Sequence, residues 1–306
     1  MSVVYIHIGR GKTGSTSFQS FCALQSDFLE AYGYSFPLAA GAESLSGHDT
    51  FAKAQIDEFP AYMKHPKNVP EAMLEFTTLL QSSESSRIIV SSEQLELANP
   101  RKVRAYFERV LPHARFKILY VVRRQDEVAE SEYNQLVKLG RFVGRFPEFV
   151  ASTFEGDYYR VAKAWSMVFG PGSVQCLPYY PGQDSTRLLL DACGFPDTQL
   201  PETKQVRKNQ SLKMEQLIAI RSLHLLGRDT GDKMIAELRS VQFETGTPAL
   251  FFDAAEARAF RNLYAKSNQR LISEFMPAHQ VEIGGRKYSD ETRDATRKLI
   301  AELNVL

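Results

Sequence analysis

The sequence predicts an α/β protein with a mainly parallel central sheet flanked by helices, followed by a helical C-terminal part. Short apolar runs rich in β-branched residues alternate with segments of helical periodicity, at residues 3–8, 87–91, 116–122 and 173–177. Strands that alternate with helices usually pair in parallel, with helices on both faces of the sheet. From Ser211 onward the pattern is almost entirely helical.

The helices are marked by apolar spacing and by residues that start or stop a helix. A helix is predicted from Ser15 to Tyr32, which Gly33 stops. Pro70 and Pro100 stand in the first turn of two others. Residues 37–70 show no regular pattern, and we expect them to form an insertion over the active face. Further helices are predicted over 70–81, 99–111, 125–139, 157–169, 184–193, 211–226, 230–240, 253–275 and 290–304.

The chain is predicted to form one domain over residues 1–306, because no repeat, low-complexity tract or linker interrupts it. Within that domain, residues 1–210 are expected to form the α/β core and residues 211–306 the helical part.

Charge and cysteine content exclude several classes of protein. Lys plus Arg number 37 and Asp plus Glu 36, so the net charge is +1. Such a chain has no overall field for a nucleic acid or an acidic membrane, and any anion site must be local. The three cysteines have neither CxxC spacing nor a nearby pair of histidines. This argues against a zinc site and a disulfide framework, and it favours a reducing compartment.

No apolar run approaches the roughly 18 residues needed to cross a bilayer. The first strand already begins at Val3 and runs into a glycine loop, where a signal peptide would have its apolar region. We therefore expect a cytoplasmic protein without a membrane span.

The loop after the first strand has the composition of an anion site. Residues 9–17 read GRGKTGSTS between a strand and a helix. Glycines let backbone N–H groups turn toward an anion, and the helix N-terminus adds unpaired donors. Lys12 adds a full charge, and its neighbours add hydroxyls. The alternative interpretation is a tight turn in which glycine serves only close packing.

The loop departs from the nucleoside-triphosphate P-loop, G-x-x-x-x-G-K-[ST], because the first glycine of that pattern would fall at Ile6. The run Lys12-Thr13-Gly14-Ser15-Thr16 instead resembles the 5′-phosphosulfate loop, K-[ST]-G-[ST]-T, of sulfotransferases that use 3′-phosphoadenosine 5′-phosphosulfate (PAPS). The resemblance implies a P-loop-like fold, PAPS as donor and 3′-phosphoadenosine 5′-phosphate (PAP) as product. It also implies donor contacts from Gly11, Lys12, Thr13, Gly14, Ser15, Thr16 and Ser17.

Arg123 and Ser131 form a second match to the same family. Arg123 follows the third predicted strand, and Ser131 stands about two helical turns later. In sulfotransferases an Arg and a Ser so placed hold the donor's 3′-phosphate, so the resemblance gives that role to these two residues. The alternative is that Arg123 caps the strand ends or pairs with Glu127.

A third match lies at residues 207–211, which read RKNQS before a predicted helix. Two cations beside a helix start can hold a phosphate. The run resembles the late basic loop of the family, and the resemblance assigns Arg207 and Lys208 to the donor. A solvated basic loop with Ser211 as helix cap is the alternative.

For the chemistry, Lys12 is the predicted stabiliser of the leaving oxygens. Glu93 follows the second predicted strand and is the candidate base. Cytosolic sulfotransferases have His at that strand end, so Glu is a departure. His48, expected to be exposed in an irregular segment, is the rival base, because histidine titrates near neutrality. Tyr5 and Trp165 are candidates for either the core or adenine packing.

Other functions remain open. A kinase-like P-loop enzyme would need an Asp at a strand end, and none is predicted there. A non-catalytic module that binds PAP or another nucleotide would keep the phosphate loops without a base. The predicted reaction moves a sulfuryl group to a hydroxyl or amine of an unidentified acceptor, with a carbohydrate or small metabolite favoured. No metal and no nucleic-acid partner are expected, and the oligomeric state is not predicted.

Overall fold

The computed structural model describes residues 2–38, 47–180, 182–201, 211–227, 233–234, 237–238, 248–285 and 287–302, with side chains up to residue 298. Its centre is a five-stranded, wholly parallel sheet in the order β2-β3-β1-β4-β5. The strands are β1 (Val3–His7), β2 (Tyr34–Ser35), β3 (Arg87–Ser91), β4 (Arg115–Val122) and β5 (Val174–Pro178). The predicted α/β class and parallel sheet are confirmed, and β2 is a short strand that the sequence pattern did not reveal.

Helices bury both faces of the sheet because successive side chains in each strand point to opposite sides. On one face, Ile6, Val90 and Tyr120 pack against α3 (Asp49–Ala54), α4 (Val69–Ser82), α5 (Pro100–Val110), α8 (Tyr158–Phe169) and α13 (Ala265–Phe275). On the other face, Tyr5 and Leu119 pack against α1 (Ser15–Leu24), α2 (Ser26–Ala31) and α9 (Ser185–Ala192).

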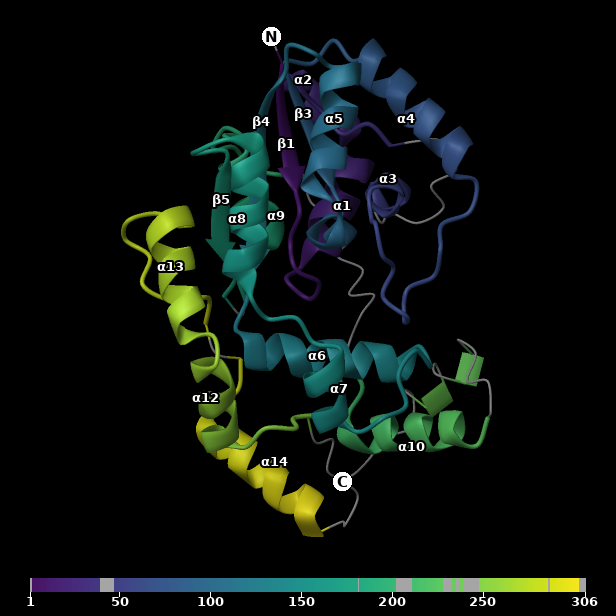
Figure 1. Ribbon diagram of the computed structural model, residues 1–306, viewed down its shortest axis with the longest axis vertical. Helices are drawn as coiled ribbons and strands as arrows, with labels where there is room; N and C mark the ends of the chain where they lie inside the picture. The colour runs from purple at the N-terminus through teal and green to yellow at the C-terminus, as the bar shows by residue number, and fades with distance from the viewer. Residues whose placement is uncertain are drawn as a thin grey trace.

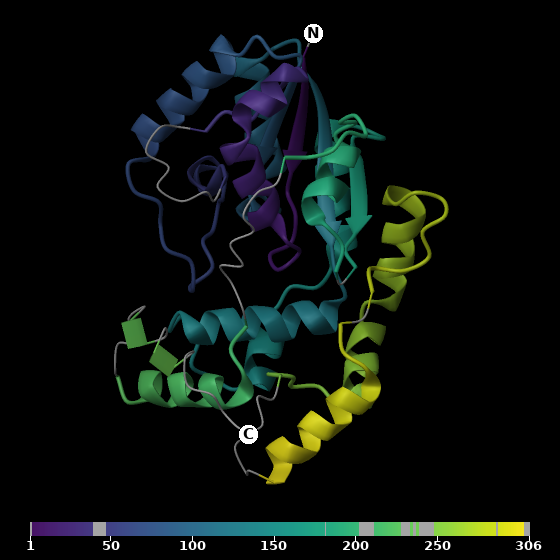
Figure 2. The same ribbon diagram turned by 180° about the vertical axis from the view of Figure 1, so that it is seen from behind.

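A third apolar cluster lies beyond the carboxyl ends of the strands. It joins α6 (Gln125–Lys138), α7 (Phe146–Ser152), α10 (Met214–Leu225) and α12 (Ala254–Asn262). Figure 1 shows these helices and α14 (Asp290–Glu302) below the strand arrowheads, and Figure 2 shows the same arrangement from behind. Helix α6, expected to belong with the α/β core, therefore also packs against the C-terminal helices. The proposed division at residue 210 stays a prediction.

Several boundaries differ from the prediction. The helix expected over 15–32 breaks at Gln25, and the one expected over 253–275 breaks at residues 263–264. Helix α3 and the 3₁₀ turn Glu93–Leu97 were not predicted, and neither was α7. Most of the helix expected over 230–240 lies outside the described residues.

Candidate functional site

The loop between β1 and α1 is held in one shape from two sides. Thr13 Oγ1 donates a 2.6 Å hydrogen bond to the carbonyl of Arg10, and Ser185 Oγ donates one of 2.9 Å to the carbonyl of Gly14. Gly14 has φ +83°, and a Cβ there would lie 2.5 Å from Ser185 Oγ. Glycine is required at this position by both its backbone and its neighbour.

The first turn of α1 is open for an anion. Gly14 is its N-cap, and no side chain of the described chain caps it. Helix N-termini with unpaired N–H groups attract anions. Gly14 and Ser17 line a cavity in front of this turn. Thr13 and Ser15 are buried, with their hydroxyl oxygens 3.3 Å apart. The cavity wall does not include Gly11, Lys12 or Thr16.

Lys12 reaches from the loop to α6. Its Nζ donates a 3.1 Å hydrogen bond to Gln135 Oε1, and its backbone is left-handed with φ +71°. Burial, then the charge of Lys138, lowers the pKa of Lys12 to about 8, although Glu93 and Glu132 oppose the shift. The Lys12 side chain therefore spans from the loop to α6, with charges of both signs acting on its ammonium.

Arg123 faces the cavity and is already paired. Its Nε and Nη2 donate to Glu127 Oε2 at 3.0 and 2.6 Å, and its Nη1 donates to the carbonyl of Lys12 at 3.1 Å. Pairing with Glu127, one of the alternatives that the sequence left open, is thus present. A guanidinium has five N–H donors, so two remain for a ligand.

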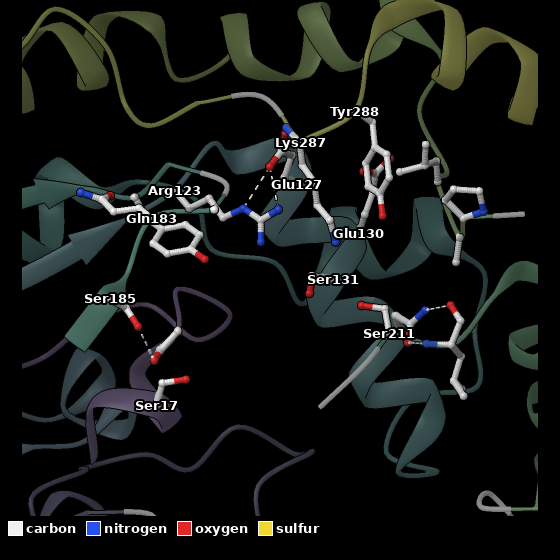
Figure 3. A pocket seen from close by; sticks show the side chains of 18 of the residues that line it. Ser17, Arg123, Glu127, Glu130, Ser131, Gln183, Ser185, Ser211, Lys287 and Tyr288 are labelled. Atoms are coloured by element: carbon white, nitrogen blue, oxygen red, sulfur yellow. Dashed lines mark hydrogen bonds and ion pairs between the residues drawn. The ribbon is translucent and has the colours of Figure 1, made fainter. Parts of the chain in front are cut away.

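The cavity has a volume of about 720 Å³, within the usual range for small-molecule sites, roughly 300–1,000 Å³. It brings together parts of the predicted segments: Gly14 and Ser17, Arg123 and Ser131, and Ser211 (Figure 3). It lies at the carboxyl end of the sheet, where open α/β sheets bind ligands. Arg207 and Lys208 lie outside the described residues. The wall also contains Glu127, Glu130, Asn134, Tyr179, Gly182, Gln183, Asp184, Ser185, Leu212, Lys213, Pro248, Ala249, Leu250, Lys287 and Tyr288.

The carboxylates of the cavity wall are all engaged by the protein. Glu130 is held by Arg293 at 2.8 Å and by the backbone N–H groups of residues 251 and 252. Asp184 caps α9 by accepting from the N–H of Thr186 at 2.8 Å. Glu127 is in turn paired with Arg123. The three carboxylates of the wall therefore repel an anion less strongly than three unpaired carboxylates would.

Glu93 stands just beyond β3 as predicted, outside the cavity wall. Burial raises its pKa, and the nearby charge of Asp49 raises it further. Hydrogen bonds from the Gln19 and Ser15 side chains oppose this shift, and Gln19 Nε2 lies 3.5 Å from Glu93 Oε2.

The expectation of an exposed His48 is wrong. His48 is 5% exposed and precedes α3 in the core. Its Nδ1 accepts from the N–H of Ser91 at 3.1 Å, and its Nε2 donates to the carbonyl of Pro37 at 2.9 Å. Burial lowers the pKa of His48 to about 4. Neither ring nitrogen is left to take a proton from a substrate.

Tyr5 and Trp165 lie in the core. Trp165 is 1% exposed and stacks on Phe169, and Tyr5 packs against Tyr34. Neither lines the cavity, so the aromatic rings available to a ligand there are those of Tyr179 and Tyr288. Sequence reasoning missed these two tyrosines and Lys287. Tyr179 follows β5 directly and could have been found by its strand-end position, whereas no strand or helix start marks Lys287.

Other site types find no support in the part of the chain described. No cluster of three or more His, Cys, Asp or Glu side chains is arranged there for a metal ion. None of the five strands of the sheet is followed at once by an Asp. Likewise, none of the helices searched is both long and apolar enough to span a bilayer.

Comparisons with known proteins give little guidance. No family model matches the chain, and no curated protein matches it. Among solved structures, it is similar to retinol dehydratase in complex with androsterone and the inactive cofactor PAP, at 14% identity. The match covers 87% of this chain and 80% of that one with a TM-score of 0.36, too low to support a functional argument.

Proposed function

We propose that this protein is a sulfotransferase that moves a sulfuryl group from PAPS to a hydroxyl or amine of an acceptor, releasing PAP. The observation that carries the proposal is the single cavity that Gly14, Ser17, Arg123, Ser131 and Ser211 line at the carboxyl end of a parallel sheet. These residues come from the three segments whose order along the chain resembles the sulfotransferase pattern.

The donor's two anionic ends have separate partners. The 5′-phosphosulfate lies against Gly14 and Ser17, where the uncapped N-terminus of α1 offers backbone donors. The 3′-phosphate lies against Arg123 and Ser131 on the α6 side. When bound, the donor supplies an activated sulfuryl group on a good leaving group.

We assign the remaining chemistry to Lys12 and Glu93 from their positions in the sequence, although neither side chain lines the cavity. The acceptor oxygen or nitrogen attacks sulfur, the bond from sulfur to the bridging oxygen breaks, and PAP leaves. Glu93 takes the acceptor's proton, and burial helps it because it brings the carboxylate pKa closer to neutrality. Lys12 stabilises the negative charge on the leaving oxygen. This is positioning and electrostatic catalysis, as in phosphoryl transfer.

The proposal is tested by incubating the protein with PAPS and a panel of sugars, amino sugars, phenols and small alcohols, and measuring PAP release. Release that depends on one acceptor class, and that Lys12→Ala abolishes, is the expected result. A matched reaction with ATP and Mg²⁺ tests the kinase-like alternative. ATP turnover with no PAP release would contradict the proposal.

A further inference from the structure

The segment between α13 and α14 passes over the cavity and is fixed there by its backbone. The N–H of Gly285 donates to the carbonyl of Tyr179 at 3.3 Å, and the N–H of Lys287 donates to Glu127 Oε1 at 2.5 Å. Ile283 is 6% exposed and packs in the core. Gly285 is thereby tied to the end of β5 and Lys287 to α6.

Gly284 makes this approach possible. Its φ is +70°, and a Cβ at this position would overlap the carbonyl oxygen of Tyr179. Only glycine accepts both the left-handed backbone and the close contact without strain. The path of the segment along the cavity wall is therefore specified by the sequence.

Lys287 carries a positive charge into the cavity. Figure 3 shows its side chain extending from the segment into the space between Arg123 and Tyr288, on the side of Ser131. Its Nζ lies 5.0 Å from the centre of the Tyr288 ring. No ion pair joins Lys287 to a carboxylate of the described chain, although Glu127 and Glu130 line the same cavity.

The reason is that stronger partners hold both carboxylates. Arg123 takes Glu127 Oε2, and Arg293, fully buried, takes Glu130. Lys287 is thus a cation at a cavity where Glu127 and Glu130 already pair with arginines. An ammonium in that setting fits an anionic ligand.

From this arrangement we infer that Lys287 is a donor-binding residue that contacts the 3′-phosphate, beside Arg123 and Ser131. The inference rests on the proposed function. Glu127 sets the position of Lys287 beside Arg123, because the same carboxylate orients the Arg123 guanidinium and holds the Lys287 backbone. Ser17, which receives the 5′ end together with Gly14, stands in the first turn of α1, away from this segment in Figure 3. Lys287 thereby distinguishes PAP from nucleotides without a 3′-phosphate.

The test compares two nucleotides on matched variants of the full chain. Affinities for PAP and for 5′-AMP, which lacks the 3′-phosphate, are measured for wild type, Lys287→Ala, Lys287→Arg and Lys298→Ala. Lys298 is an exposed lysine on α14 outside the cavity wall, so it controls for loss of a surface charge. Circular dichroism and thermal unfolding check that each variant is folded.

We expect Lys287→Ala to weaken PAP about 5- to 20-fold while changing 5′-AMP affinity less than about twofold. Lys287→Arg keeps the charge and stays within about threefold of wild type, and Lys298→Ala matches wild type. A Lys287→Ala variant that binds PAP like wild type would overturn the inference and leave the proposed function standing. Equal losses for PAP and 5′-AMP would also overturn it. A wild-type protein that binds no PAP would instead refute the proposed function itself.

Discussion

Arg123 Nη1 donates a 3.1 Å hydrogen bond to the carbonyl oxygen of Lys12, 111 positions earlier in the chain. The bond joins the end of β4 to the loop after β1 through the lysine's backbone. The Lys12 side chain points elsewhere, to Gln135 on α6. Loop geometry and the catalytic charge assigned to Lys12 therefore depend on different atoms of one residue, and substitution can separate them.

Lys12→Ala is expected to lower kcat by about 10²–10³-fold and to leave PAP affinity within a few-fold of wild type. The carbonyl that Arg123 holds remains, while the ammonium that stabilises the leaving oxygen is lost. Single-turnover rates with PAPS and titration with PAP measure the two effects.

Lys12→Gly is the matched control, because glycine tolerates φ +71° better than alanine. It is expected to be just as inactive as Lys12→Ala but about 1 kcal/mol more stable in urea unfolding. Parallel losses of rate and PAP affinity in both variants would mean that Lys12 binds the donor rather than the transition state.

The pH dependence of kcat/KM is expected to be bell-shaped. Glu93 must be ionised to accept a proton, so the rate rises with pH through its raised pKa, above the ordinary value of about 4.3. Lys12 must be protonated, so the rate falls above its pKa of about 8. In Glu93→Gln the residual rate should lose the acid limb and keep the alkaline limb. An unchanged acid limb in that variant would exclude Glu93 as the base.

His48 is expected to link stability to pH rather than to catalysis. Burial lowers its folded-state pKa to about 4, below the unfolded value near 6.5, so the folded protein favours the neutral ring. Its stabilising contribution is complete above pH 6.5 and is lost as the pH falls toward 4. The loss is about 3 kcal/mol in the free energy of unfolding by pH 4.

Urea unfolding of wild type and His48→Gln across pH 7 to 4 measures this contribution. Between pH 7 and 4, the free energy of unfolding of the variant should fall by about 3 kcal/mol less than that of wild type. His7, whose pKa burial lowers to about 3, contributes the same loss to both proteins. If the free energy of unfolding falls equally with pH in wild type and His48→Gln, His48 is not the group responsible. If His48→Gln is as stable as wild type but loses turnover, His48 has a catalytic role after all.

Gly284→Ala is expected to weaken PAP binding because it displaces the segment that carries Lys287. Gly194→Ala is the matched control: Gly194 has φ +73°, but its Cβ would meet no atom within 4 Å. Both variants carry the left-handed strain of about 1–2 kcal/mol. Only Gly284→Ala adds the clash with Tyr179, so only it should be further destabilised and lose PAP affinity. Equal behaviour of the two variants in chemical unfolding and PAP titration would argue against the role given to this segment.

The sequence predicted the sheet well because buried parallel strands are read from continuous apolar runs, such as residues 118–122. It missed β2, since two residues are too few for a pattern. It also missed the burial of His48: a histidine in an irregular segment looks solvated until Ser91 and Pro37 supply partners for both ring nitrogens.

For the site, the glycine loop and the family resemblance at Arg123 and Ser131 pointed to residues of which Gly14, Ser17, Arg123 and Ser131 line the cavity. The other predicted loop residues, Gly11, Lys12, Thr13, Ser15 and Thr16, do not line it. Their expected ligand stays a prediction. Lys287 could not be found this way, because its place depends on Gly284 meeting Tyr179, a contact between residues 105 positions apart.

The most direct test of the central claim is calorimetric titration of PAP into the full chain and into Arg123→Ala. We expect one site per chain with a Kd of about 1 µM, which corresponds to a binding free energy of about −8 kcal/mol. Arg123→Ala should weaken it by about 1.5–3 kcal/mol, because a charged hydrogen bond to phosphate is lost. No detectable heat with wild type at roughly millimolar PAP, or an unchanged Kd in Arg123→Ala, would contradict the account.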